Sequence, residues 1–462
     1  MSTQMHSKSY ESSKFIYLFK RALKTREQVL PIGILQEYLN SFLQRKGELI
    51  ESSSRFGTPQ YFVDEPSLLL RINQFKEAFT KHIDRLRIFY ALKSNSFSGI
   101  CRKVISKGIG LDVSSGMELS TALSMGCKEI IFSGPGKTSD ELMLAIRKRQ
   151  KVTLLIDSFG ELQRLSDLLI REPIGGENLK IGVRIHVTGQ WSKFGVPLEG
   201  LSLILKMARN LKGVNPCGIQ FHSSWNLDPS AQITMINAIG SYIRQHRQAN
   251  LWNPLRFIDI GGGFWPEQGE WLNPNNTLKG KLIQLLDPGF QFRTIHYFRR
   301  AKPLDYFSRE ISKSLKQHGS PLSDLEVWVE PGRWISTPAM HILLKVIDKK
   351  DPRTVITDGG TNLLGWERPL NEFIPLINLT RPSLKEHRTR VFGSLCTPYD
   401  VWGSSYFGDG INTGDILLVP DQGAYTFSLR QSFIKPKARI IRFDGTTSEE
   451  IEMEESYHPP QL

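Results

Sequence analysis

Eight short apolar runs recur along the middle of the chain, and most are separated by a stretch with the periodicity of an amphipathic helix. Strand-like runs that alternate with helical segments are typical of βα units, and eight such units can close into a parallel barrel. We therefore expect the α/β class, with a (β/α)8 barrel over residues 57–335. The runs are 88–92, 109–113, 129–132, 152–156, 181–187, 218–221, 257–260 and 327–329.

An open, doubly wound parallel sheet would produce the same alternation. Such sheets usually carry a G-x-G-x-x-G phosphate fingerprint after their first strand, and this chain has none there. The open sheet is therefore the structural alternative to the barrel.

The regions that flank the barrel have a different texture. Residues 336–462 contain apolar runs separated by turn signals rather than by long helices, which predicts a C-terminal all-β domain. Its predicted strands are 342–346, 354–356, 416–419, 424–427 and 438–443, and the early run 61–63 is expected to join them.

Residues 1–56 form an N-terminal extension that is helix-like over 34–49. The stretch 264–324 is rich in Trp, Asn and basic residues, and is predicted to hold a lid or a contact for the substrate's tail.

Composition excludes several classes of protein. The net charge of +13 over 462 residues comes from scattered Lys and Arg, with no basic run and no nucleic-acid motif. Four isolated cysteines without a C-x-x-C pair argue against a zinc site and a disulfide framework. No apolar stretch is long enough for a membrane span or a signal-peptide core, so a cytoplasmic enzyme is expected.

Chemistry in a barrel of this kind sits at the carboxyl ends of the strands. Lys93 closes the first run, and burial of its stem can lower the pKa of its amine, which makes it a candidate nucleophile towards an aldehyde. The second run ends at 112–114, which contains Asp112, and His222 and Glu330 close later runs in the same way. Each residue alone is more often structural, since a strand-end lysine commonly just meets water.

Taken together, the residues of this rim fit an aromatic, phosphorylated aldehyde such as pyridoxal phosphate (PLP). Three glycines, Gly261, Gly262 and Gly263, let backbone N–H groups approach a phosphate, and Arg333 adds a fixed cation. His222 could lie flat against the ring, Glu330 could accept a hydrogen bond from the ring nitrogen, and Lys93 could form the imine.

At this point the chain resembles the fold-type III PLP-dependent decarboxylases, the group of the diaminopimelate and ornithine/arginine decarboxylases. The resemblance runs from about residue 58 to the last strands. It implies an alanine-racemase-like barrel, a C-terminal β-domain and PLP on Lys93. The matching motifs are YALKSN at 90–95, DVSSGMEL at 112–119, SKFG at 192–195, GGG at 261–263, EPGR at 330–333, CTPYD at 396–400 and GAY at 423–425.

The resemblance also implies roles for single residues. His222 would stack on the pyridine ring and Glu330 would bind its nitrogen, while Asp112 would belong to the cofactor site. The phosphate would be held by Gly261, Gly262, Gly263, Arg333 and Tyr425. Cys396 would come from the partner subunit of a head-to-tail homodimer and reprotonate the substrate carbon after CO₂ is lost.

Two alternatives share the barrel. Racemases of this fold place an arginine at the ring nitrogen, so Glu330 favours a decarboxylase, because it keeps the ring protonated and electron-accepting. A non-catalytic PLP carrier typically lacks a β-domain, which this chain is expected to have.

Two departures from the family concern the phosphate and the substrate. The family's His-x-Gly-Ser is replaced by HSSW at 222–225, which leaves Ser223 and Ser224 as phosphate donors and adds a bulky indole. The acid that usually follows the cysteine is replaced by Thr397, which removes the main reason to bind a cationic tail. The substrate is thus predicted to be an amino acid or a conjugate, such as a citryl-amino-acid intermediate of siderophore biosynthesis. The candidate substrate contacts are Asp358, Arg368, Thr397 and Asp400.

Overall fold

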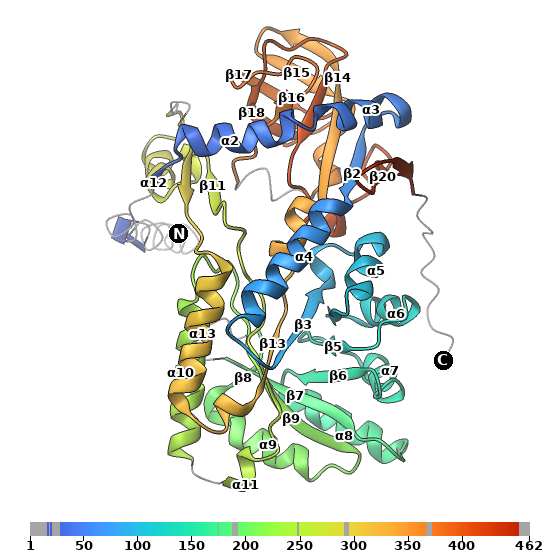
Figure 1. The fold of residues 1–462 in the computed structure, drawn as a ribbon, viewed down its shortest axis with the longest axis vertical. Coiled ribbons are helices and arrows are strands. Elements are labelled where there is room, and N and C mark those ends of the chain that lie inside the picture. The colour runs from blue at the N-terminus through green and yellow to red at the C-terminus, as the bar shows by residue number, and fades with distance from the viewer. Residues whose placement is uncertain are drawn as a thin grey trace, which may run out of the picture.

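The computed structural model describes residues 16–17, 19–20, 28–173, 175–186, 193–246, 249–290, 295–365 and 372–451. Two bodies lie one above the other along the long axis, a barrel below and a β-domain above, as Figure 1 shows.

Eight parallel strands close the barrel in chain order. The first strand, β3, pairs with the last, β13, through Leu86 and Val327, while β6 pairs with β7 at the point opposite. All eight apolar runs of the sequence fall on these strands, so the predicted α/β barrel is confirmed. The strands are β3 (Leu86–Ala91), β4 (Gly110–Val113), β5 (Ile130–Phe132), β6 (Val152–Ile156), β7 (Leu179–His186), β9 (Val214–Gln220), β10 (Phe257–Asp259) and β13 (Glu326–Val329).

Helices pack around the outside of the barrel, and four of them begin at a residue whose side chain caps the first turn. The hydroxyl of Thr138 accepts a hydrogen bond from the Glu141 amide, while the Glu141 carboxylate bonds back to the Thr138 amide and completes a capping box. Such caps fix where these four helices begin and therefore where the loops that precede them end. The helices are α4 (Glu65–Thr80), α5 (Ser98–Ser106), α6 (Gly116–Ser124), α7 (Ser139–Arg147), α8 (Phe159–Arg171), α9 (Leu201–Arg209), α10 (Ser230–Gln245), α11 (Ala249–Trp252), α13 (Leu304–His318) and α14 (Arg333–Ser336).

The β-domain is built on one nine-stranded sheet. The early strand β2 lies between β14 and β20 in this sheet, so the expectation that the run 61–63 joins the β-domain is confirmed. The order is β15 (Thr354–Thr357), β17 (Glu386–Phe392), β18 (Val401–Phe407), β16 (Ile377–Asn378), β19 (Ile416–Val419), β14 (Met340–Asp351), β2 (Gln60–Asp64), β20 (Arg439–Phe443) and β21 (Ser448–Glu450).

One predicted strand of this domain is wrong. Residues 424–427 form a turn that leads into the 3₁₀ helix η7 (Phe427–Leu429), and Tyr425 has a positive φ of 56°. The segment turns here because its backbone bonds to the barrel, with the Tyr425 amide donating to the Ser94 carbonyl at 2.7 Å. Strands β17 and β18 were not predicted, because their alternation is broken by polar residues and bulges.

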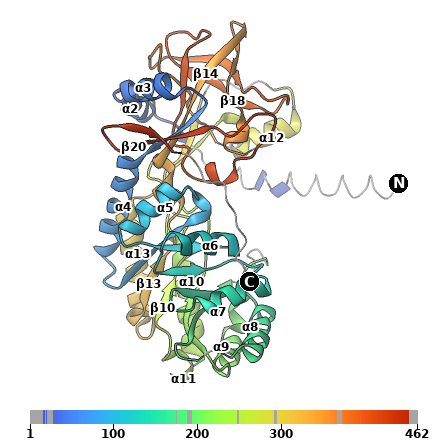
Figure 2. The same ribbon diagram turned by 90° about the vertical axis from the view of Figure 1, so that its right-hand side faces the viewer.

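The N-terminal extension is part of the β-domain's packing. Helices α2 (Ile32–Leu43) and α3 (Lys46–Phe56) lie against the β-domain, above α4 and α5 (Figure 2). Leu35, Leu39 and Phe42 of α2 share one hydrophobic cluster with Phe62 of β2 and Leu343 of β14. Because these side chains are buried in this shared cluster, the extension covers part of one face of the sheet.

The stretch after the seventh barrel strand also reaches the β-domain. Strands β11 (Glu270–Leu272) and β12 (Tyr297–Arg299) form a small antiparallel sheet with β1 (Gln28–Val29), and α12 (Leu278–Leu286) lies between them in sequence. Trp271 packs edge-on against Tyr38 of α2, with ring centroids 4.9 Å apart. This insertion therefore ties the barrel to the N-terminal helices.

Across the described ranges, no helix combines the length and the apolar character that a membrane crossing requires. The same ranges contain no cluster of His, Cys, Asp and Glu that could hold a metal ion.

Candidate active site

Lys93 lies on the barrel rim, in the 3₁₀ turn η1 (Leu92–Ser94) that follows β3. Its Nζ atom is 2.7 Å from Oδ2 of Asp112, which is fully buried on the neighbouring strand β4. Burial alone would lower the pKa of the Lys93 amine, but the charges of Asp112 and Glu330 outweigh it and raise that pKa above its ordinary value. The expectation of a lowered pKa is therefore wrong for the cofactor-free chain, because a carboxylate is paired with the amine.

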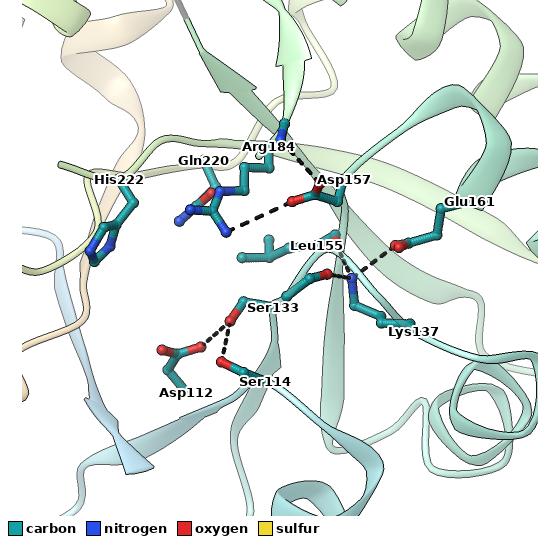
Figure 3. A network of polar contacts seen from close by, with 12 residues as sticks. Asp112, Ser114, Ser133, Lys137, Leu155, Asp157, Glu161, Arg184, Gln220 and His222 are labelled. Atoms are coloured by element: carbon teal, nitrogen blue, oxygen red, sulfur yellow. Dashed lines mark hydrogen bonds and ion pairs between the residues drawn. The ribbon is translucent and has the colours of Figure 1, made fainter. Parts of the chain in front are cut away.

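Asp112 is itself held from a third strand. Its other oxygen accepts a hydrogen bond of 2.6 Å from the hydroxyl of Ser133, which follows β5 and lies 3.3 Å from the hydroxyl of Ser114 (Figure 3). The carboxylate is thus fixed between the lysine and a serine pair.

Glu330 follows β13 and is 2% exposed. One oxygen accepts a hydrogen bond from Nε2 of Gln220 at 3.2 Å, and the other lies 3.2 Å from Nδ1 of His222. Burial would raise the pKa of Glu330, but His222 and the Lys93 ammonium outweigh it and keep the pKa below its usual value. The structure therefore brings together the lysine, the histidine and an ionised glutamate, all three predicted from strand ends.

The three glycines after β10 leave no room for side chains. A Cβ on Gly262 would lie 2.2 Å from the carbonyl oxygen of Glu330, and one on Gly263 would lie 2.2 Å from that of Ser223. Gly263 also has a positive φ of 76°. Ser223, in the neighbouring loop that follows β9, has a buried hydroxyl with no hydrogen-bond partner among the described residues, so an unused donor lies beside the glycines.

Trp225 stands where the family usually has a serine. It is 71% exposed and adopts a positive φ of 62°, a conformation that is strained for a bulky residue. The adjacent Asn226 holds the loop, since its amide donates to the Gly263 carbonyl at 2.9 Å.

Arg333 lies at the junction of the barrel, the insertion and the β-domain. Its guanidinium group is 4.4 Å from the ring centre of Trp265 and 5.1 Å from that of Tyr425, and it pairs with Glu372 at 3.7 Å. Stacking between two rings orients the planar cation. The structure thus places Arg333 and Tyr425, distant in sequence, side by side.

A second polar network lines the rim next to Asp112 (Figure 3). Asp157, which follows β6, pairs with Arg184 at 3.7 Å and accepts a hydrogen bond of 3.0 Å from the Gly195 amide. Lys137 is buried and donates to Glu161 and to two backbone carbonyls. Because its three hydrogen-bond donors are already used, Lys137 stabilises the loop and has no donor left for a ligand.

The predicted substrate residues lie mostly on the β-domain. Cys396 is exposed on the loop between β17 and β18. Asp400 is 1% exposed, and its oxygens accept hydrogen bonds from the Leu395 amide and from the amide and hydroxyl of Thr361. This burial does not fit the prediction that Asp400 binds substrate, because its carboxylate is used up in holding the Cys396 loop.

Asp358 is half-buried, and both of its oxygens are occupied, one by the Thr58 hydroxyl and the other by the Lys345 amide. Thr397, next to Cys396, is partly exposed. Arg368 and Ser192, both singled out in the sequence, lie outside the described residues.

Three residues of the site were missed in the sequence. Asp157 obeys the same strand-end rule that found Asp112 and could have been found with it. Gln220 and Asp259 sit on β9 and β10 inside apolar runs, where period and composition indicate only a buried strand.

The groups on this rim fit PLP. A glycine loop with an unpartnered buried hydroxyl suits a phosphate, and Glu330 beside His222 suits a protonated ring nitrogen next to a stacked imidazole. Lys93 supplies the amine. A barrel with this rim and an appended β-domain defines a class of protein, the PLP enzymes of the alanine-racemase-like barrel.

Comparison with known proteins agrees with this class. Residues 68–337 match the family described as "Pyridoxal-dependent decarboxylase, pyridoxal binding domain". The diaminopimelate decarboxylase of Methanothermobacter thermautotrophicus is 27% identical over 412 residues, which are 84% of this chain and 86% of that protein. The 2-[(L-alanin-3-ylcarbamoyl)methyl]-2-hydroxybutanedioate decarboxylase of Staphylococcus aureus is 25% identical over 371 residues, or 74% and 84% of the two chains.

Solved structures show the same fold. The crystal structure of the diaminopimelate decarboxylase from M. jannaschii has a TM-score of 0.73 at 23% identity and covers 88% of this chain and 92% of its own. That of the Helicobacter pylori enzyme complexed with L-lysine has a TM-score of 0.71, also at 23% identity, with coverages of 87% and 95%. The chain belongs to the pyridoxal-dependent decarboxylase family: it uses PLP and decarboxylates an amino-acid substrate.

Proposed function

We propose that Lys93 binds the aldehyde carbon of PLP, that His222 packs on the ring and that Glu330 holds the ring nitrogen. Bound in this way, PLP withdraws electrons and stabilises the negative charge that remains on the substrate carbon when CO₂ leaves. The single observation that carries the proposal is the buried arrangement of Glu330 between Gln220 and His222, since a carboxylate kept ionised there favours a protonated ring.

The phosphate is proposed to lie against the glycine loop. Gly261, Gly262 and Gly263 leave the backbone open, and the buried Ser223 hydroxyl takes the place of the family's serine. Arg333 and Tyr425 add a cation and a phenol from the other side. Asp112 is proposed to orient the Lys93 amine in the free enzyme.

We also propose that the enzyme acts as a homodimer in the cytoplasm. Cys396 of the partner subunit would return a proton to the substrate carbon after decarboxylation. Its own loop supports this role, because Cys396 is exposed while Asp400 fixes the loop from within. Mixing Lys93→Ala and Cys396→Ala chains tests it, since only a hybrid dimer contains one intact site. Restored activity is expected, and an inactive mixture would contradict shared sites.

For the substrate, we propose an amino acid joined to a carboxylate-rich group, as in the substrate named for the staphylococcal relative. Thr397 offers no charge to a distal amine, and the carboxylate of Asp358 is already engaged on both oxygens. Arg368 and the excess of positive charge suit carboxylates. A site without an unpaired acidic side chain gains little binding affinity from a cationic tail on the substrate.

The test is CO₂ release from a matched panel. The panel contains a citryl-diaminopropionate conjugate, free diaminopropionate, meso-diaminopimelate, lysine and ornithine. We expect turnover of the conjugate and at least about tenfold lower kcat/KM for the free diamino acids, which corresponds to one missing charged contact of about 1.5 kcal/mol. Rapid turnover of diaminopimelate or lysine, with the conjugate untouched, would overturn this choice of substrate.

A further inference from the structure

A second carboxyl group, that of Asp259, lies next to Glu330. Asp259 ends β10, the strand next to β13, and its side chain is fully buried. The backbone continues the pairing past both strands, because the Glu330 amide donates to the Gly261 carbonyl at 2.9 Å. This pairing brings the carboxyl groups of Asp259 and Glu330 within hydrogen-bonding reach of each other.

The donors around the two groups are too few for two ionised carboxylates. Glu330 uses Gln220 on one oxygen and His222 on the other. Asp259 accepts one hydrogen bond, of 2.9 Å, from the Gly261 amide on its Oδ1 atom. Its Oδ2 atom is buried without any partner among the described residues. A proton placed between the groups would satisfy that oxygen, since a protonated carboxyl both donates and accepts.

The balance of charge points the same way. Besides their effect on each other, the titratable groups that act most strongly on Asp259 and Glu330 are Asp112, Lys93 and His222. Lys93 is already paired with Asp112 at 2.7 Å, so the described part of the chain supplies no separate cation for a third buried carboxylate. Burial, followed by the charge of Glu330, raises the pKa of Asp259 well above its ordinary value, whereas the pKa of Glu330 is lowered.

We propose that Asp259 keeps its proton in the folded protein and donates it in a hydrogen bond to Glu330, so that the two form one carboxyl–carboxylate pair with a single negative charge. Asp259 is then a positioning residue: it acts on the cofactor only through Glu330. The pair fixes the orientation of Glu330 and leaves its ionised carboxylate in contact with His222. The effect of this pair on the cofactor rests on the proposed role of Glu330, whereas the presence of the pair in the protein does not depend on that role.

The test compares the PLP-loaded wild type with Asp259→Asn. Asparagine has the shape of a protonated aspartic acid and can donate to Glu330, so the variant should fold. We expect the infrared C=O stretch of a protonated carboxylic acid in the wild type at neutral pH, and its loss in Asp259→Asn. A wild type without this stretch, or a stretch that persists in the variant, would overturn the proposal.

A second measurement follows the pH dependence of unfolding in both proteins. A carboxyl protonated in the folded state and ionised in the unfolded state weakens folding as pH rises above the ordinary aspartate pKa of about 4. The unfolding equilibrium constant of the wild type, relative to that of Asp259→Asn, should therefore increase by up to about tenfold per pH unit from pH 4 upward. A ratio that stays constant or falls would contradict a protonated Asp259. Neither measurement requires turnover. If the pair is detected but the protein releases no CO₂, only the proposed function is refuted.

Discussion

The Nζ atom of Lys93 lies 2.7 Å from Oδ2 of Asp112, and the two residues stand at the ends of neighbouring parallel strands. The pairing keeps the amine charged in the cofactor-free protein, although an amine must be neutral to attack an aldehyde. PLP binding therefore requires that this pair separates or loses its charge. Asp112 is thus expected to affect how readily the protein binds PLP.

Replacement of Asp112 by asparagine should lower the pKa of the Lys93 amine, because the largest charge that raises it is removed. We expect at least about a tenfold larger neutral fraction of the amine at a given pH. Acetylation of Lys93 against pH, read by mass spectrometry on cofactor-free protein, measures this fraction. Asp157→Asn is the matched control, since Asp157 pairs with Arg184. An unchanged Lys93 profile in Asp112→Asn would contradict the account.

The variant Gly262→Ala should bind PLP at least about tenfold more weakly. Its Cβ would lie 2.2 Å from the Glu330 carbonyl oxygen, so the glycine loop must move away from the phosphate position. Titration of the cofactor-free protein with PLP, followed by absorbance, gives the Kd. Gly136→Ala serves as control, because nothing lies within 4 Å of its Cβ. Equal affinities of the two variants would show that this loop does not hold the phosphate.

Asp64 joins the N-terminal extension to the β-domain. Its buried carboxylate accepts hydrogen bonds from Arg45 at 2.5 Å and from the Ser67 hydroxyl at 2.7 Å, and it faces His341 at 3.7 Å. Burial would raise the pKa of Asp64, but these partners outweigh it and the pKa is lowered. The stability that it contributes is therefore present above the ordinary aspartate pKa and lost as pH falls below about 4.

Asp64→Asn should accordingly cost roughly 1.5–3 kcal/mol at pH 7, the value of a hydrogen bond to a charged group, and less as the pH falls towards 3. Denaturant unfolding at the two pH values measures the difference. The partly exposed Asp305, which pairs with Lys81 and His82, gives a control variant that should change less. A loss in Asp64→Asn that is the same at both pH values would contradict the charged pairing.

The variant Thr397→Asp restores an acid beside Cys396. If the missing carboxylate excludes free diamino acids, the variant should gain about tenfold or more in kcat/KM for lysine or diaminopimelate, through a charge-assisted contact to the distal amine. Thr397→Asn, which is similar in shape but neutral, should gain nothing. Equal kinetics of the two variants would show that the residue at position 397 does not determine which substrate the enzyme uses.

The barrel and most of its rim could be predicted from the sequence, because parallel strands carry their chemistry at one end. That rule alone leads from the apolar runs to Lys93, Asp112, His222 and Glu330. The joint motifs were needed to recognise the cofactor, since each residue alone is common at the end of a strand.

Other features depend on contacts between distant segments, which periodicity does not report. Tyr425 sits in a turn rather than a strand because its amide bonds to Ser94 of the barrel. The pairing of β1 with β12 joins residue 28 to residue 298. Asp259 lies inside an apolar run, where the pattern predicts only a buried strand. The burial of Asp400 depends on the folded conformation of its loop, which periodicity does not predict.

The covalent attachment of PLP to Lys93 is the central claim, and reduction tests it directly. The PLP-loaded protein is treated with borohydride, digested and mapped by mass spectrometry. We predict one pyridoxyl adduct, on the peptide that contains Lys93, and none in Lys93→Ala. An adduct on another lysine, or one that persists in Lys93→Ala, would contradict the assignment of the site.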